Sequence, residues 1–117
     1  MEENKGKLKL LSKIDKFYAT LLPVLRKFPK TQRYTMAINI ENELLSCVRL
    51  VYFIAYQKYQ RAENLKALRI QLHLLNFLIR ASHGQNFISD AGYELYAKEV
   101  SELGKITSQW LKTVEKK

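Results

Sequence analysis

The side chains that most often carry out catalysis or bind metals are sparse in this sequence. His73 and His83 have no carboxylate or thiol neighbours at the spacing of metal ligands. No glycine-rich phosphate loop occurs, and neither Ser46 nor Cys47 lies in a recognisable nucleophile motif. The sequence therefore predicts a protein that has no metal, no cofactor and no catalytic site of its own.

Two pairs of acidic residues are close enough in the sequence to be considered for general acid–base catalysis. They are Glu41 with Glu43 and Glu99 with Glu102. Such catalysis needs two carboxyl groups that face one cleft, and nothing near either pair indicates a cleft. We interpret both pairs as solvated surface or as members of a buried ion pair.

Basic side chains are the most abundant ionisable groups. Lys and Arg number 20 against 11 Asp and Glu, which gives a formal net charge of +9 at pH 7. In so small a protein this charge creates a surface field that attracts polyanions, of which nucleic acid is the commonest. Residues 1–30 carry eight bases against three acids, whereas residues 90–117 balance at five of each. The field is therefore expected on the first and third helices.

Two rows of basic residues have the spacing of a helix face, since their members step by three or four positions. The candidate nucleic-acid-binding residues are Lys66, Arg69, His73 and Arg80 in one row, Lys9, Lys13 and Lys16 in the other, and Lys30 and Arg33 between them. The row at 66–80, which also contains Asn76, is expected opposite the leucine face of its helix. Such rows can track a phosphate backbone. The alternative is an ordinary solvated face.

A run of apolar residues from Leu50 to Tyr56 has no polar interruption. A helix that is apolar on every side is buried on every side, and a helix in a four-helix bundle keeps one side in water. We therefore expect a homo-oligomer, with Leu50, Tyr52, Phe53 and Tyr56 at the subunit interface. The alternative is a broad core face from which the tyrosine hydroxyls reach water.

Apolar residues at three- and four-residue spacing predict the helices that position these groups. The expected helices cover residues 7–27, 32–59, 65–82 and 90–114. Pro29 and Thr31 favour a break and a cap before the second helix, and Ser89 is a good N-cap for the fourth. The second break contains neither Gly nor Pro, and we place it at residues 60–64 with Asn64 as a cap.

The length of 117 residues suits a single domain over residues 1–117. Four long helices with short turns pack most simply as an all-α, antiparallel up-down-up-down four-helix bundle. No apolar stretch is long enough to cross a membrane. Cys47 is the only cysteine, which agrees with a reducing compartment. We expect a cytoplasmic protein.

Several motifs resemble those of the accessory variability determinant proteins of diversity-generating retroelements. They are Phe28-Pro29-Lys30 with Arg33, Ile40-Glu41-Asn42, Leu68-Arg69 through Leu78-Ile79-Arg80, Glu102-Leu103-Gly104-Lys105 and Trp110-Leu111-Lys112. The resemblance implies a basic four-helix bundle that forms a homopentameric barrel. It also implies that the protein binds the element's reverse transcriptase and its template RNA or cDNA during mutagenic homing.

One position departs from the family pattern. Such proteins tend to have a second glycine just before the tryptophan, where this chain has Ser108-Gln109, and this puts close helix packing there in doubt. Bundle proteins encoded in intervening sequences of 23S ribosomal RNA genes are the alternative family, but their Ala-Glu-Gly signature is not seen here. Under that alternative the chain is a structural interaction module without a reverse transcriptase partner.

Overall fold

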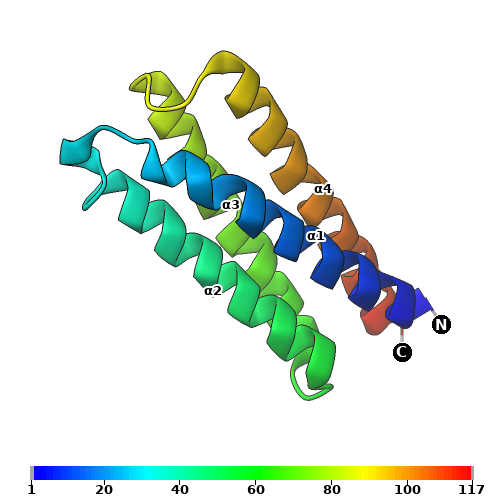
Figure 1. Cartoon of the computed structure of the whole chain (residues 1–117). Helices are drawn as coiled ribbons and strands as arrows, with labels where there is room; N and C mark the ends of the chain where they lie inside the picture. The colour runs from blue at the N-terminus through cyan, green and yellow to red at the C-terminus, as the bar shows by residue number, and fades with distance from the viewer. Residues whose placement is uncertain (1, 117) are drawn as a thin grey trace.

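The chain forms an all-α bundle in the computed structural model, which describes residues 2–116 and the side chains of residues 5–116. Its helices are α1 (Glu2–Arg26), α2 (Met36–Tyr56), α3 (Arg61–Gly84) and α4 (Asp90–Glu115), and a 3-10 turn, η1 (Lys30–Gln32), precedes α2. Successive helices run in opposite directions, and both termini lie at one end (Figure 1). Each helix packs against its neighbours in the chain, and α1 packs against α4. The predicted fold is confirmed.

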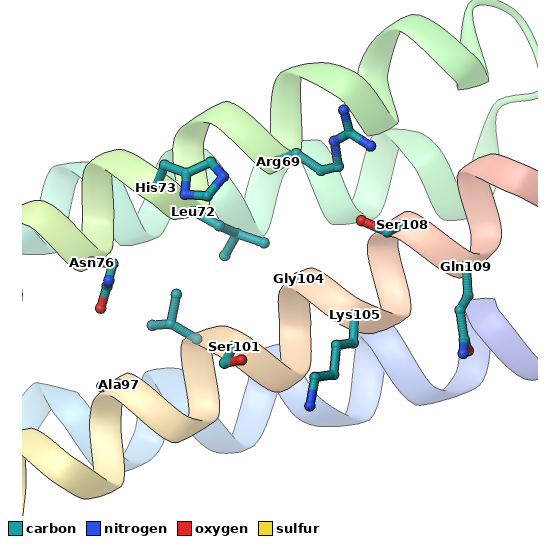
Figure 2. Close-up of a pocket in the computed structure, with 11 residues that line it drawn as sticks. Arg69, Leu72, His73, Asn76, Ala97, Ser101, Gly104, Lys105, Ser108 and Gln109 are labelled. Atoms are coloured by element: carbon teal, nitrogen blue, oxygen red, sulfur yellow. The ribbon is translucent and has the colours of Figure 1, made fainter.

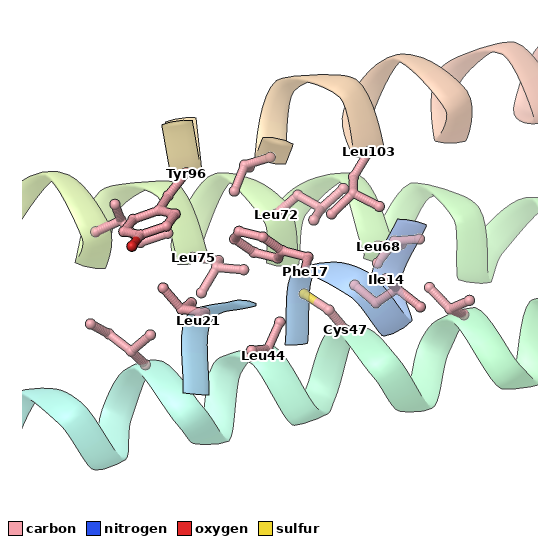
Figure 3. Close-up of a cluster of buried hydrophobic side chains, with 14 of the residues drawn as sticks. Ile14, Phe17, Leu21, Leu44, Cys47, Leu68, Leu72, Leu75, Tyr96 and Leu103 are labelled. Atoms are coloured by element: carbon pink, nitrogen blue, oxygen red, sulfur yellow. The ribbon is translucent and has the colours of Figure 1, made fainter. Parts of the chain in front are cut away.

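The core is one cluster of apolar side chains along the bundle axis (Figure 3). The leucine face of α3 is buried as predicted. α4 also buries one face, formed by Tyr96, Val100, Leu103, Thr107 and Trp110. Thr107 is the polar member of that face, and its hydroxyl donates to the Leu103 carbonyl (2.7 Å). Cys47 lies in the core, where burial raises the pKa of its thiol to about 12. This cysteine is therefore a packing residue and not a nucleophile.

The break before α2 is longer than predicted. Thr31 lies in η1 and caps no α-helix, and α2 begins at Met36. The Pro29 carbonyl accepts a hydrogen bond from the Gln32 amide (2.7 Å), which closes the 3-10 turn. The Thr35 hydroxyl then donates to the Gln32 side chain (2.9 Å). These local bonds occupy the segment that was expected to start the helix.

The turn between α2 and α3 lies earlier in the chain than predicted. α2 ends at Tyr56 and α3 begins at Arg61, so the predicted cap, Asn64, is inside α3. Gln60 adopts a left-handed backbone conformation (φ 55°), for which Gly is the usual residue. The Arg61 Nε donates to the Ile54 carbonyl (2.8 Å), and this bond satisfies the end of α2 from across the turn.

The start of α4 was predicted more accurately than the start of α1. α4 starts as expected, since the Ser89 Oγ accepts a hydrogen bond from the Gly92 amide (3.1 Å). α1 begins at Glu2, before its predicted start at residue 7, although its apolar face begins only at Leu10. Apolar periodicity locates the buried part of a helix and not its exposed first turns.

Trp110 connects α4 to two other helices near the termini. Its side chain is 3% exposed, and the Arg61 guanidinium lies over the indole at 5.3 Å from the ring centre. A Cβ atom on Gly6 of α1 would lie 3.3 Å from two indole carbons, which is closer than ordinary contact. The glycine that permits close packing on Trp110 therefore comes from α1, and Ser108-Gln109 does not prevent it.

We expect the substitution Gly6→Leu to destabilise the fold because its side chain would push α1 away from Trp110. Overpacking of this kind costs about 1–2 kcal/mol after the gain in helix propensity, or a fall of about 4–8 °C in Tm. Thermal unfolding followed by circular dichroism measures the effect. Gly84→Leu is the matched control, since a Cβ there meets nothing within 4 Å. Equal melting of the two variants would contradict the role of Gly6.

Candidate nucleic-acid interface

The first of two polar grooves runs between α3 and α4 and has a volume of about 630 Å³ (Figure 2). Leu72 and Val100 form its floor and are 3% and 6% exposed. Arg69 and His73 of α3 and Lys105 of α4 line it at exposed positions. Among the described residues, those lining this groove include no carboxylate. The groove is thus open, cationic and apolar at its base.

The second groove lies between α1 and α4 near the termini and has a volume of about 690 Å³. Gln109 lines both grooves, so they flank α4 on its two sides. Trp110 also lines the second groove, and its Nε1 is buried without a hydrogen-bond partner in the described structure. Four lysines line it: Lys5, Lys9, Lys112 and Lys116. Here too the described lining contains no acidic residue.

Two of the predicted binding residues are held in ion pairs instead. The Lys13 Nζ lies 2.5 Å from the Glu102 Oε2, and the Lys66 Nζ lies 3.5 Å from the Glu115 Oε2. Both carboxylates belong to α4, but they face lysines outside the grooves. Neither of these two ion pairs involves a lysine that lines a groove, but Glu102 also interacts electrostatically with the groove residue Lys105.

The structure separates the other predicted residues into two groups. Lys9, Arg69 and His73 lie in the grooves. Lys16, Lys30, Arg33 and Arg80 line neither groove. Arg80 lies over the Phe77 ring at 5.9 Å, and the Arg33 Nε donates to the Phe28 carbonyl (3.2 Å) at the end of the bundle opposite the termini. The last four residues remain predictions as binding residues, without support from the groove geometry.

Three lysines at the C-terminal end of the chain line the grooves but were not among the predicted residues: Lys105 and Lys112 of α4 and Lys116 directly after it. The charge of residues 90–117 is balanced overall, and this average conceals that most of the acids lie in the first half of the helix. The positions 105, 109, 112 and 116 step by four, three and four. That spacing was a signal for a polar stripe on the second half of α4.

The predicted oligomer interface is only partly at the surface. Tyr52, Phe53 and Tyr56 are 43%, 50% and 65% exposed, whereas Leu50 is half-buried and packs against the core. The Lys7 ammonium lies over the Tyr56 ring at 4.6 Å and the Tyr52 hydroxyl donates to the Asp15 Oδ1 (3.5 Å), so both tyrosines contact α1. Phe53 has no hydroxyl to account for its exposure. The outward face of α2 is therefore more apolar than an ordinary solvent-exposed helix face.

A second exposed apolar row was missed in the sequence. Ile70, Leu74 and Phe77 of α3 are 62%, 45% and 54% exposed and step by four and three positions. They occupy the outward face, opposite the buried leucines. Arg69 and His73 were expected on that face, but they turn toward α4 and line its groove. The basic row therefore flanks the leucine face instead of opposing it.

Other candidate sites lack the features they would need. The described residues contain no group of three or more His, Cys, Asp or Glu that could hold a metal ion. The His83 Nε2 lies 2.7 Å from Asp90 and its ring stacks on Tyr93 at 4.4 Å, so this histidine organises the α3–α4 turn. No described helix is both long enough and apolar enough to span a membrane.

The fold and the two cationic grooves define a small, basic four-helix-bundle protein with surfaces suited to binding. The chain belongs to the bAvd-like family, whose model matches residues 8–114. This match confirms the resemblance to the accessory variability determinant proteins, a family of accessory, non-catalytic proteins. A comparison with curated proteins found no match.

The Lys13–Glu102 pair makes stability depend on pH in a definite direction. The hydrogen bond from Lys13 holds the pKa of Glu102 below its ordinary value of 4.5, and the same bond raises the pKa of Lys13 above 10.5. For Glu102, the stabilisation is complete above pH 4.5 and is lost as the pH falls through the lowered pKa. For Lys13, it is complete below pH 10.5 and is lost as the pH rises through the raised pKa.

We therefore expect Glu102→Gln to melt below the wild type at pH 7 and to approach it as the pH falls through the lowered pKa of Glu102, because the carboxylate is then protonated. Thermal melts across this range measure the difference. Glu94→Gln removes the same charge from an exposed position of α4 and serves as the control. A difference between wild type and Glu102→Gln that stays constant with pH would contradict the pairing.

Proposed function

We propose that this protein is a basic, non-catalytic accessory protein of a diversity-generating retroelement, and that it binds the element's reverse transcriptase and the template RNA or cDNA. Family membership supports the accessory role. The observation that carries nucleic-acid binding is the gathering of cations in the two grooves that flank α4, whose described linings contain no carboxylate.

The electrostatic argument starts from the mutual repulsion of these cations. Lys5 and Lys9 of α1 line the same groove as Lys112 of α4 and Lys116 directly after α4, and the described lining offers no carboxylate. Like charges in one groove lower the stability of a bundle unless an anion neutralises them. A phosphate backbone supplies closely spaced anions and releases its counterions on binding. The grooves therefore suit a polyanionic strand.

Homo-oligomerisation is the second part of the proposal, with a pentamer expected from the resemblance. The exposed Tyr52, Phe53 and Tyr56 of α2 support it, because an apolar patch of this kind marks an interaction surface. α2 packs against α1 and α3 and lies diagonally across the bundle from α4. Subunit contact through α2 would thus leave both grooves accessible.

Binding to single-stranded RNA should depend on salt through the groove lysines. We expect the triple substitution Lys9→Gln, Lys112→Gln and Lys116→Gln to reduce the slope of log K against log salt by about 2, since each lost phosphate contact contributes about 0.7. Fluorescence anisotropy between about 50 and 200 mM salt measures this. The control variant, Lys27→Gln, Lys58→Gln and Lys98→Gln, removes equal charge at exposed positions that line neither groove and are not predicted binding residues. Equal slopes for the two variants would disprove the groove assignment.

Light scattering should give a mass several times 13.8 kDa. We expect Phe53→Glu to dissociate the assembly to 13.8 kDa, because burying a charge in an apolar interface carries a large desolvation cost. Leu95→Glu is the control, since Leu95 is 47% exposed on α4, away from the predicted interface. A wild type that is monomeric at micromolar concentration, or a Phe53→Glu protein that keeps the full mass, would refute this interface.

A further inference from the structure

Gly104 lies in the interior of α4 without a packing reason. A Cβ atom at this position would meet nothing within 4 Å, in contrast to Gly6, where it would crowd Trp110. Its φ angle is not positive, so the backbone does not require glycine. Glycine in the middle of a helix is less favourable than alanine. Glycine at position 104 therefore favours binding and not folding, because it lets a ligand approach α4 closely.

Gly104 lies on the wall of the α3–α4 groove (Figure 2). The same wall of α4 carries Ala97, Ser101 and Ser108, which are also small. These residues leave the groove open down to Leu72 and Val100, which are almost fully buried and expose only a small apolar area at its floor. The volume of about 630 Å³ is within the range of small-ligand sites, which is about 300–1,000 Å³. A flat group can lie on this floor only where the wall has no bulky side chain.

The polar groups of the groove suggest the chemistry of that flat group. The Asn76 Oδ1 is buried and has no hydrogen-bond partner among the described residues. Asn76 lines the groove, and rotation of its side chain would bring this unpartnered oxygen to the polar edge of a base. Arg69 and Lys105 line the same groove at exposed positions, where they can meet phosphates. A nucleotide matches these groups, because it has a flat ring, a polar base edge and a flanking phosphate.

The groove suits a nucleotide better than a helix of a partner protein. Its exposed lining residues are all polar or cationic, namely Arg69, His73, Ser101, Lys105 and Gln109. A docked helix would need exposed apolar residues along the rim of the groove. Such residues lie on the outward face of α3 instead, at Ile70, Leu74 and Phe77.

We propose that the α3–α4 groove binds one unpaired nucleotide of a single strand. The base lies over Leu72 and Val100 beside Gly104, its polar edge faces Asn76, and its phosphates face Arg69 and Lys105. The inference rests on the proposed nucleic-acid binding and adds recognition of a base to it. A base within a duplex cannot enter, because its polar edge is already paired and its faces are stacked.

The test compares wild type, Gly104→Leu and Gly84→Leu in binding labelled homopolymeric RNA 12-mers of each base. Leucine at 104 projects into the groove, where its Cβ meets nothing within 4 Å, and it should raise Tm by about 4 °C through helix propensity; the Tm then shows that the fold is kept. We expect the wild type to prefer one base. Gly104→Leu should bind that 12-mer at least tenfold more weakly, lose the preference and keep the wild-type salt slope. Gly84→Leu should behave as wild type.

Three other outcomes would overturn either the nucleotide site or the nucleic-acid binding on which it rests. If Gly104→Leu keeps both the affinity and the base preference of the wild type, the nucleotide site is overturned while nucleic-acid binding stands. If the variant keeps RNA binding but loses the reverse transcriptase, the groove takes a protein segment and the inference is again overturned. If the wild type binds none of the 12-mers at low salt, the proposed nucleic-acid binding fails, and the nucleotide site fails with it.

Discussion

The contacts of Trp110 with Arg61 and Gly6 determine how the helices meet at the end of the bundle that carries the second groove. Arg61 acts in two ways, since it donates to the Ile54 carbonyl at the end of α2 and lies over the indole of α4. Gly6 lets α1 approach the same indole closely. This approach sets the register of α1 against α4, and the register places Lys5 and Lys9 in one groove with Lys112 and Lys116. The cationic groove therefore depends on the uncharged packing contact between Gly6 and Trp110.

The distribution of carboxylates explains why the grooves stay cationic although α4 as a whole is nearly balanced. Glu102 pairs with Lys13 and Glu115 pairs with Lys66, so each acid compensates a lysine outside the grooves. Exposed pairs of this kind contribute little to stability. Glu102 also interacts electrostatically with Lys105 and so partly compensates the α3–α4 groove, whereas the charged residues in the described lining of the second groove are all lysines. A bundle held together by a continuous apolar core can tolerate the remaining repulsion, because that core and not the surface charge supplies most of its stability.

The sequence predicted those parts of the structure that depend on local periodicity. The apolar steps of α3 and α4 identified their buried faces, and Ser89 identified the start of α4. The turn after α2 could not be predicted, because Gln60 adopts a conformation typical of glycine and Arg61 is held by contacts with other helices. The candidate site was predicted in part for a similar reason. The spacing of Lys9 and Lys13 predicts that they share a helix face. It does not predict that Lys13 pairs with Glu102 while Lys9 lines a groove, because both contacts depend on how α4 packs beside α1.

The arrangement of surfaces around the bundle follows from its order of helices. α4 neighbours α3 and α1, so its two flanks are the natural places for grooves that combine residues of all three helices. α2 is the remaining helix, and it carries the exposed Tyr52, Phe53 and Tyr56. In an assembly built through α2, the grooves of every subunit would remain open to one strand. Linked sites bind a common ligand more tightly than isolated sites, because each later contact is intramolecular. Oligomerisation and cationic grooves are thus complementary: weak, salt-sensitive contacts become effective when several copies of α4 face the same polyanion.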